Sequence, residues 1–397
     1  MSVNKLLFFI LCVGLGLNLV VRGGQEAERN RLDLSTRPPA INELGAHKTV
    51  ALGLVYNGNS HPQFREGVNM AVAEVNARGG LLGKPLGLIE MDEAALDPEE
   101  RDRNVVARQL VENSALLAVI GHSTRANAAQ AAILYDANSV IYLNALVAHK
   151  TLSNLPLDYT FAIIPDSRDI GEGIADAMSQ LGLRSVAIVR DPSDLSGEIA
   201  IAATNRAAYR KIDIALQVTL HRQQASYQDL LTRLDQADVD ALVILANRQM
   251  REGLLLDAAR LRYDRPILLG HPEGFGLTAK DRFSENLVIL KPSLFAEQEN
   301  AYQVADFRRA FLRSYGVTPN GWAGQGYDAV LLLAAAVDAA QSLDPSVVAP
   351  ALRNSLPWAG ITVGYPHISP QPTDYSESLT FVPGNTLASD IFISSNR

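Results

Sequence analysis

The sequence contains a single cysteine, Cys12, among 397 residues. One cysteine cannot form an intramolecular disulfide or a cysteine-rich metal site, so both are excluded. None of His61, His122, His149 and His271 is followed by a second histidine or a cysteine two to four residues later, which argues against a zinc site. The chain has no run of lysine or arginine and a net charge of −8, which argues against a nucleic-acid surface. We therefore expect no metal, no cofactor and no nucleic-acid partner.

Motifs of common enzyme classes are also missing. The sequence has no GxSxG elbow, no GxxxxGK[ST] loop and no GxGxxG after a strand. The glycine-rich segment 321–326 (GWAGQG) precedes a helical pattern, and we interpret it as a site of close packing rather than a phosphate cradle. Asp92 and Asp97 resemble a carboxylate pair, but Asp92 ends a predicted strand and Asp97 begins a predicted helix. No enzymatic activity is predicted.

The N-terminal segment indicates export. Lys5 precedes an apolar run over 6–21, which is shorter than the ~20 residues of a spanning helix and has the charged-then-apolar order of a secretory signal. A leucine precedes Cys12 where a lipoprotein signal requires a small residue. We predict that residues 1–23 are a signal peptide or a retained anchor, and that the polar residues 24–47 are a linker.

From residue 49 onward the chain alternates between apolar strands and amphipathic helices. Strands that are apolar throughout are typical of parallel sheets covered on both faces, and two such series in a chain of this length predict two doubly wound α/β lobes. The predicted strands lie at 49–56, 86–92, 116–121, 140–146 and 160–165, and then at 185–191, 215–220, 241–246, 266–270 and 286–290.

Helices are predicted between the strands and dominate after residue 290. The first helix ends at Gly79 and Gly80, which suit a left-handed C-cap, and Asp97 with Pro98 has the composition of a helix start. The predicted helices lie at 64–77, 126–137, 169–181, 197–210, 227–237, 249–262, 300–315, 323–342 and 346–355, with short strands near 379–382 and 390–395.

Polar residues follow two of the strands directly. Residues 122–125 (HSTR) lie between a strand and a helix, where free N–H groups and Arg125 could hold an anion, although N-capping by Ser123 or Thr124 is an alternative. In the second series Glu273 lies in a proline-containing turn after a strand, and a solvated loop acid is the alternative. Together the two turns suggest a cleft for a small zwitterion or carboxylate.

Several segments, in this order, resemble the periplasmic leucine/isoleucine/valine-binding family, the type I substrate-binding proteins of ABC importers. The resemblance covers roughly residues 48–395 and implies two lobes joined by three crossovers, with a ligand in the cleft and hinge closure on binding. It implies a first lobe of 48–166 plus 293–357 and a second of 167–292 plus 358–397. The segments are AVAEVNARGGLLGKPL, the Asp-Glu and Asp-Pro after it, VIGHSTRANAAQAA, SVAIVRD before Ser-Gly-Glu, GHPEG and GYDAVLLLAAAVDAA.

The resemblance also implies a ligand site, although several family residues are replaced. The family's carboxylate-binding serine falls on Arg125, a small residue and a threonine fall on Leu146 and Ala148, and a tyrosine of the second lobe falls on Ser196. Glu273 keeps the acid that faces a ligand ammonium, and the loop from residue 56 is about two residues shorter than in the family. The predicted ligand-binding residues are Tyr56, Ser123, Thr124, Arg125, Leu146, Ala148, Ser196, Glu273 and, for a further aromatic position, Asn247 and Arg248.

We therefore expect an exported, monomeric solute-binding protein that captures a small carboxylate or an amino-acid-like ligand. The resemblance implies delivery of this ligand to an ABC permease in the inner membrane. A periplasmic sensor that signals to a membrane receptor is the alternative, and it is favoured if the N-terminal segment stays as an anchor. An enzyme on the same fold is a third possibility.

Overall fold

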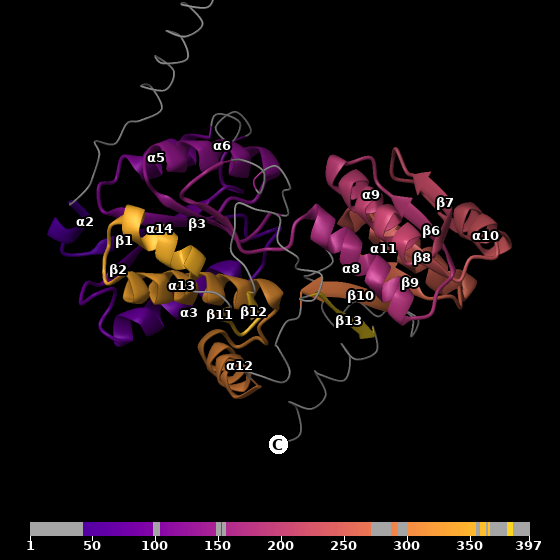
Figure 1. Ribbon diagram of the computed structural model, residues 1–397. Coiled ribbons are helices and arrows are strands. Elements are labelled where there is room, and N and C mark those ends of the chain that lie inside the picture. Colours follow the sequence, from indigo (N-terminus) through magenta and orange to yellow (C-terminus); the bar gives the residue numbers. More distant parts are fainter. Residues whose placement is uncertain are drawn as a thin grey trace, which may run out of the picture.

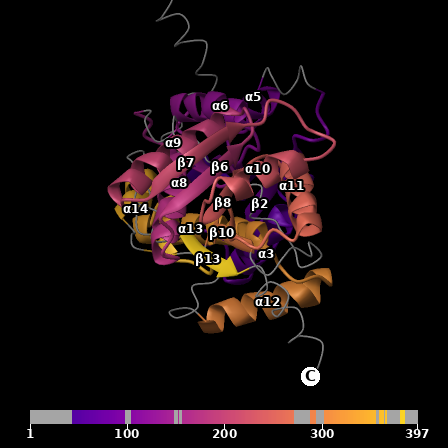
Figure 2. The same cartoon turned by 90° about the vertical axis from the view of Figure 1, so that its right-hand side faces the viewer.

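The computed structural model consists of two lobes that lie side by side, each built on its own β-sheet (Figure 1). Figure 2 turns the second lobe toward the viewer and shows helices on both sides of its sheet. The two-lobed, doubly wound fold predicted from the sequence is thereby confirmed. The residues that the structure describes are 43–97, 104–147, 152, 156–270, 287–292, 301–354, 358–362, 364–365 and 379–383.

The first sheet is entirely parallel, with the strand order β2-β1-β3-β4-β5. Every residue of β1 and β3 is buried, as their unbroken apolar sequences predict. β4 ends earlier than predicted because the Asn144 side chain bonds both the N–H and the carbonyl of Val147, which turns the chain. The strands are β1 (Val50–Tyr56), β2 (Leu86–Asp92), β3 (Leu116–Gly121), β4 (Ile141–Asn144) and β5 (Thr160–Ala162).

Helices from both ends of the chain cover the first sheet (Figure 1). The helix at 64–77 ends as predicted. Gly79 and Gly80 have φ angles of +106° and +76°, and the Gly80 N–H donates to the Val75 carbonyl at 2.9 Å. The helices are α2 (Glu43–Ala46), α3 (Phe64–Ala77), α5 (Val105–Val111), α6 (Arg125–Ala137), α12 (Ala301–Tyr315), α13 (Gly321–Ala340) and α14 (Pro345–Asn354).

The glycine-rich start of α13 packs tightly against α3, as the sequence predicts. A Cβ atom on Gly67 of α3 would lie 1.9 Å from the Ala323 carbonyl oxygen, and one on Gly326 of α13 would lie 2.5 Å from the Phe64 carbonyl oxygen. No side chain fits at either distance. The two backbones therefore approach so closely only because both positions are glycine.

The second sheet has the order β13-β10-β9-β8-β6-β7 and is parallel except for β13, which pairs antiparallel with β10. Because β13 comes from the C-terminal part of the chain, the chain passes between the lobes three times: after β5, between β10 and α12, and before β13. The strands are β6 (Ser185–Arg190), β7 (Asp213–Thr219), β8 (Ala241–Leu245), β9 (Ile267–Leu269), β10 (Leu287–Pro292) and β13 (Leu379–Pro383).

Helices on the two faces of the second sheet bury alternate residues of its strands. Val186 and Ile188 belong to the core on the side of α8 and α9, whereas Ala187 and Val189 belong to the core on the side of α10 and α11. Side-chain caps start α8 and α9 two to three residues before the predicted positions. The helices are α8 (Ser167–Gln180), α9 (Asp194–Tyr209), α10 (Gln228–Gln236) and α11 (Arg248–Leu261).

Two short strands, β11 (Trp358–Ala359) and β12 (Gly364–Tyr365), form a small antiparallel pair. The N–H groups of Ile361 and Thr362 each donate to Asp328 of α13 at 2.9 Å, so these two residues lie on the first lobe and not on the second, to which the expected boundary at residue 358 assigned them. The predicted signal or anchor, residues 24–42 of the predicted linker, the helix start at Pro98 and the strand near 390–395 lie outside the described residues. The prediction of a linker is wrong for residues 43–47, because they include α2, Leu44 is buried, and Lys84 donates to the carbonyls of Gly45 and His47.

Candidate functional site

The strand orders show where a ligand would bind in each lobe. In the first sheet the strand after β1 lies on one side of it and the next strand, β3, lies on the other side, so the strand order reverses between β1 and β3. The second sheet reverses its strand order in the same way between β6 and β8. Ligands of open α/β sheets bind beyond the carboxyl ends of strands at such switch points. Tyr56 and Gly121 end the first pair of strands, and Arg190 and Leu245 end the second pair. These four positions define the candidate site.

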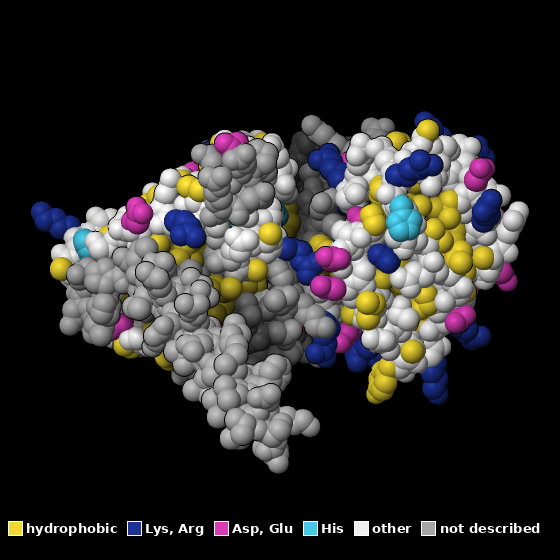
Figure 3. Space-filling model, turned by 90° about the horizontal axis from the view of Figure 1, so that it is seen from above, with side chains coloured by type: hydrophobic (Ala, Val, Ile, Leu, Met, Phe, Trp, Pro, Cys, Tyr) yellow, Lys and Arg dark blue, Asp and Glu magenta, His cyan; other side chains and the backbone are white. Residues whose placement is uncertain are grey.

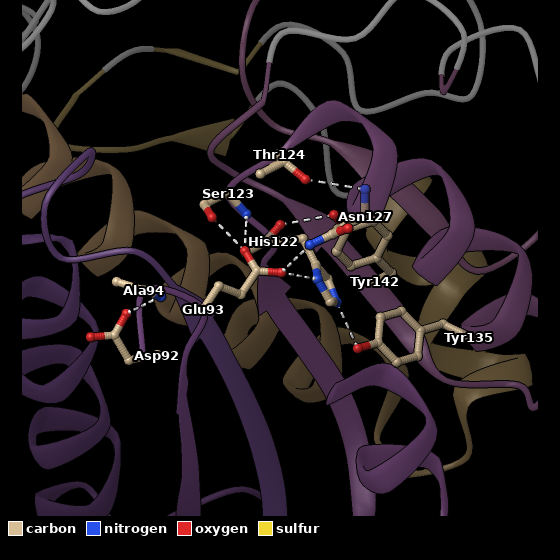
Figure 4. A network of polar contacts seen from close by, with 10 residues as sticks. Asp92, Glu93, Ala94, His122, Ser123, Thr124, Asn127, Tyr135 and Tyr142 are labelled. Atoms are coloured by element: carbon tan, nitrogen blue, oxygen red, sulfur yellow. Dashed lines mark hydrogen bonds and ion pairs between the residues drawn. The ribbon is translucent and has the colours of Figure 1, made fainter. Parts of the chain in front are cut away.

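A buried carboxylate, that of Glu93, holds the turn between β3 and α6 (Figure 4). One oxygen of Glu93 accepts the backbone N–H of Ser123 at 2.7 Å and the Ser123 hydroxyl. The other accepts from Nδ2 of Asn127 at 3.0 Å and lies 3.0 Å from Nδ1 of His122. Burial alone would raise the pKa of Glu93, but the contacts with His122 and Ser123 lower it to about 2. The anion at this helix start is therefore a carboxylate of the protein itself.

The network continues from Glu93 into the core of the first lobe. Nε2 of His122 lies 2.8 Å from the Tyr135 hydroxyl, and the Tyr142 hydroxyl donates to the Gly121 carbonyl at 2.8 Å (Figure 4). His122 has a φ angle of +58°, which is uncommon for a residue other than glycine although histidine adopts it more often than most, and these contacts hold it there. The turn is consequently held by hydrogen bonds within the first lobe.

Thr124 and Arg125, which follow this turn, have different roles. Thr124 is the N-cap of α6, because its side chain accepts the Asn127 N–H at 3.2 Å, so the capping interpretation is correct for this residue. Arg125 reaches to the second lobe, where its Nη2 atom donates to both carboxylate oxygens of Glu198 at 3.0 and 2.9 Å. Glu198 also accepts the Ser167 hydroxyl at 2.6 Å. An ion pair thus connects the two lobes.

A second buried carboxylate, Asp191, organises the corresponding turn of the second lobe. It accepts the N–H groups of Ser193 at 2.9 Å and Asn247 at 2.7 Å, and so ties the end of β6 to the end of β8. Burial alone would raise the pKa of Asp191, but hydrogen bonds from Ser193, Ser196 and Asn247 lower it. Ser196 is fully buried, and Asn247 caps α11 by accepting the Met250 N–H at 3.1 Å. Both predicted site residues stabilise this turn.

The other predicted site residues are dispersed. Tyr56 ends β1 and is nearly buried, and its carbonyl accepts the Glu93 N–H at 2.7 Å. Leu146 is buried beyond β4. Ala148 and Glu273 lie outside the described residues.

Arg248 does not join the other predicted residues. Its side chain is 73% exposed, and its Nε atom donates to Glu252 one turn further along α11 at 2.7 Å. This is a surface pair within one helix. The prediction of Arg248 as a ligand contact thus gains no support from the position of its side chain.

A cavity of about 720 Å³ lies where the lobes meet, and Figure 3 shows basic and acidic side chains meeting at this junction. Arg125 is the predicted site residue, among those described, that lines it. The cavity combines two guanidinium groups, two carboxylates and an apolar wall. From the first lobe it is lined by Arg125, and from the second by Arg190, Pro192, Ser193, Asp194, Leu195, Gly197, Glu198 and Ile201.

Five charged residues of this region were not predicted as site residues: Glu93, Arg190, Asp191, Asp194 and Glu198. Arg190 had a signal, because a charged residue ends the otherwise apolar strand SVAIVR. Glu93 and Glu198 lie in segments that carry the family resemblance, but no local pattern identified their partners, which they meet only through the fold. In the part of the chain that the structure describes, no three His, Cys, Asp or Glu side chains are grouped as a metal site requires.

Comparison with known proteins gives consistent matches. The family model described as "Periplasmic binding protein" matches residues 55–371. The chain is 26% identical over 306 residues to the Leu/Ile/Val-binding protein homolog 2 of Brucella abortus, covering 75% of this chain and 78% of that protein. It is 22% identical over 317 residues to an amino acid binding protein of Pseudomonas aeruginosa, covering 75% and 79%.

Solved structures agree with these sequence matches. An ABC transporter substrate-binding protein from Desulfitobacterium hafniense, solved in complex with Leu, superposes with a TM-score of 0.69 and 25% identity. The similarity covers 79% of this chain and 91% of that chain. Its fold accordingly extends over both lobes.

Proposed function

Because the chain belongs to the periplasmic binding protein family, we propose that it captures a small carboxylate or an amino-acid-like ligand in the interlobe cleft for an ABC importer. The relatives named Leu/Ile/Val-binding protein confirm the resemblance that the sequence motifs indicate. The observation that carries the proposal is the cavity between the lobes, which presents the guanidinium groups of Arg125 and Arg190 beside the apolar side chains of Leu195 and Ile201. A ligand with an anionic group and an apolar body suits these walls.

Closure of the two lobes around the ligand follows from how they are connected. The ion pair of Arg125 and Glu198 forms only when the lobes are in contact, so in this proposal it helps to hold the closed state. Glu93 and Asp191 each bond groups of their own lobe, so we expect each lobe to move as a unit. We retain the remaining predicted ligand contacts as part of the proposal: Tyr56, Leu146, and the turn residues Ser123, Thr124, Ser196 and Asn247.

Export and delivery complete the proposed role. The family implies a periplasmic protein, and we propose that a monomer presents its ligand to a permease in the inner membrane. Among the described residues no single helix has the length and apolarity needed to cross a membrane, although α13 and α14, which are bent by 107° at their junction, meet both criteria as a pair.

The proposal is tested with a ligand panel. The twenty amino acids and a series of small carboxylates that includes benzoate are screened by thermal shift, each beside its primary amide, because a ligand of the folded state raises the melting temperature. Small-angle scattering should then show a smaller radius of gyration at saturation. Binding without compaction would contradict closure, and conversion of a ligand to product would contradict a transport role.

A further inference from the structure

We propose that Arg190, rather than Arg125, holds the anionic group of the ligand, which binds while Arg125 remains paired with Glu198. This inference rests on the proposed function and assigns the ligand carboxylate to the second lobe. It follows from three observations: the partners of Arg125, the unfilled donors of Arg190, and the position of Arg190 in the sheet.

Arg125 already has a carboxylate. Its Nη2 atom donates to both oxygens of Glu198, and the Ser167 hydroxyl, at 2.6 Å, holds that carboxylate in place. A ligand anion at Arg125 would have to displace Glu198 and leave a second negative charge beside itself. Like charges at this distance repel, so this exchange is unfavourable.

Arg190 has N–H donors available for a ligand. A guanidinium carries five N–H donors, and in the structure Nη1 of Arg190 donates to the Asp191 backbone carbonyl at 3.1 Å. Its Nε atom is buried and, among the residues that the structure describes, has no hydrogen-bond partner. An unsatisfied buried donor is costly, and a carboxylate is the group that accepts parallel hydrogen bonds from a guanidinium. Arg190 also lines the cavity, so a ligand can reach its side chain.

The position of Arg190 is the one at which this fold binds ligands. It is the last residue of β6, at the switch point with β8. Arg190 donates to the backbone carbonyl of Asp191, whereas the Asp191 carboxylate accepts the N–H groups of Ser193 and Asn247. Leu195 and Ile201 line the same cavity, so the ligand that fits is a small carboxylate with an apolar body.

The experiment compares Arg190→Gln with Arg125→Gln, using Arg233→Gln as the control. Arg233 is an exposed residue of α10 in the same lobe and does not line the cavity. Calorimetry is run with two matched pairs, benzoate with benzamide and L-leucine with L-leucinamide. We expect the wild type to prefer the acid over the amide in at least one pair.

In that pair Arg190→Gln should lower the affinity for the acid by at least about 30-fold and abolish the preference, as expected for the loss of one partner of a buried charge pair. Arg125→Gln should lower it about fivefold and keep the preference. Arg233→Gln should change neither. Asp194→Asn, which removes a negative charge from the same cavity, should raise the affinity for the acid. If Arg190→Gln does not fold, Arg190→Lys keeps the charge but not the fork and should show an intermediate loss.

Two results overturn the inference, and they differ from each other. If Arg190→Gln (or Arg190→Lys in its place) binds the acid as the wild type does while Arg125→Gln loses the preference, Arg125 holds the anion and the proposed function stands. If the wild type binds neither acid, or prefers neither over its amide, the anionic ligand of the proposed function fails and the role of Arg190 fails with it.

Discussion

Removing the charge from one side of the interlobe ion pair should weaken ligand binding by destabilising the closed state. Nη2 of Arg125 lies 3.0 and 2.9 Å from the two oxygens of Glu198, and the two side chains are 24% and 34% exposed. Because both side chains are partly buried, solvent screens the pair less than a fully exposed one, and its contribution lies near the upper end of the range for surface pairs, about 1 kcal/mol. Because the pair joins the lobes, all of this free energy stabilises contact between them.

Arg125→Gln and Glu198→Gln should therefore each lower the affinity for the carboxylate probe about fivefold, which corresponds to about 1 kcal/mol. The double variant should be no weaker than either single variant, since both changes remove the same interaction. The assay is calorimetry on the four proteins at low and high salt, and the difference should shrink as salt rises. Scattering should show a larger radius of gyration for the ligand-free variants.

An increase in affinity in Glu198→Gln would refute this reasoning, because it would mean that Glu198 competes with the ligand for Arg125. Strictly additive losses in the double variant would also refute it, because the two residues would then act independently. The melting temperature of each ligand-free variant is the control for folding.

Three further predictions concern the fold and the N-terminus. Gly67→Ala should lower the free energy of unfolding by about 1–3 kcal/mol, because its Cβ atom would clash with the Ala323 carbonyl. The control is Gly45→Ala, whose Cβ atom would have no described atom within 4 Å and which should be neutral or stabilising. Equal effects of the two substitutions in chemical denaturation would contradict the packing argument. Acidification should destabilise the protein in two steps. Burial lowers the pKa of His61 to about 4, below its unfolded value, so stability falls between pH 6.5 and 4 by about 3 kcal/mol, and this fall should be absent in His61→Gln. Glu93, with its pKa lowered to about 2, causes a further loss from about pH 4.5 downward that Glu93→Gln should lack; an unchanged pH profile in either variant would be the contrary result. N-terminal sequencing of the native protein should find a start between about residues 22 and 30, and an intact Met1 in the membrane fraction would favour the anchored sensor.

The secondary structure was predictable because its signals are local. Strands such as β1 and β3 are apolar at every position, and α3 ends at two glycines that adopt left-handed conformations. The helix boundaries shifted by two or three residues where a cap acts. Asp166, for example, accepts the N–H groups of Arg168 and Asp169, so α8 starts before its apolar pattern does.

The candidate site was less predictable because its contacts connect distant parts of the sequence. Arg125 and Glu198 are separated by 73 positions, and their pairing depends on how the lobes are placed. Glu93 reaches Ser123 because β2 and β3 flank β1, a consequence of strand order rather than of any motif. The motif at 122–125 correctly marked the turn, but it could not show that the anion there is an internal one.

The contact between α3 and α13 has a consequence for the order in which the chain acquires structure. The face of α3 at Gly67 packs against the backbone of α13 at Ala323, some 255 positions later in the sequence. A chain that emerges from its N-terminus first cannot complete the first lobe until the whole second sheet except β13 has also emerged. Until α13 has emerged, the face of α3 around Gly67 therefore has no α13 backbone to pack against.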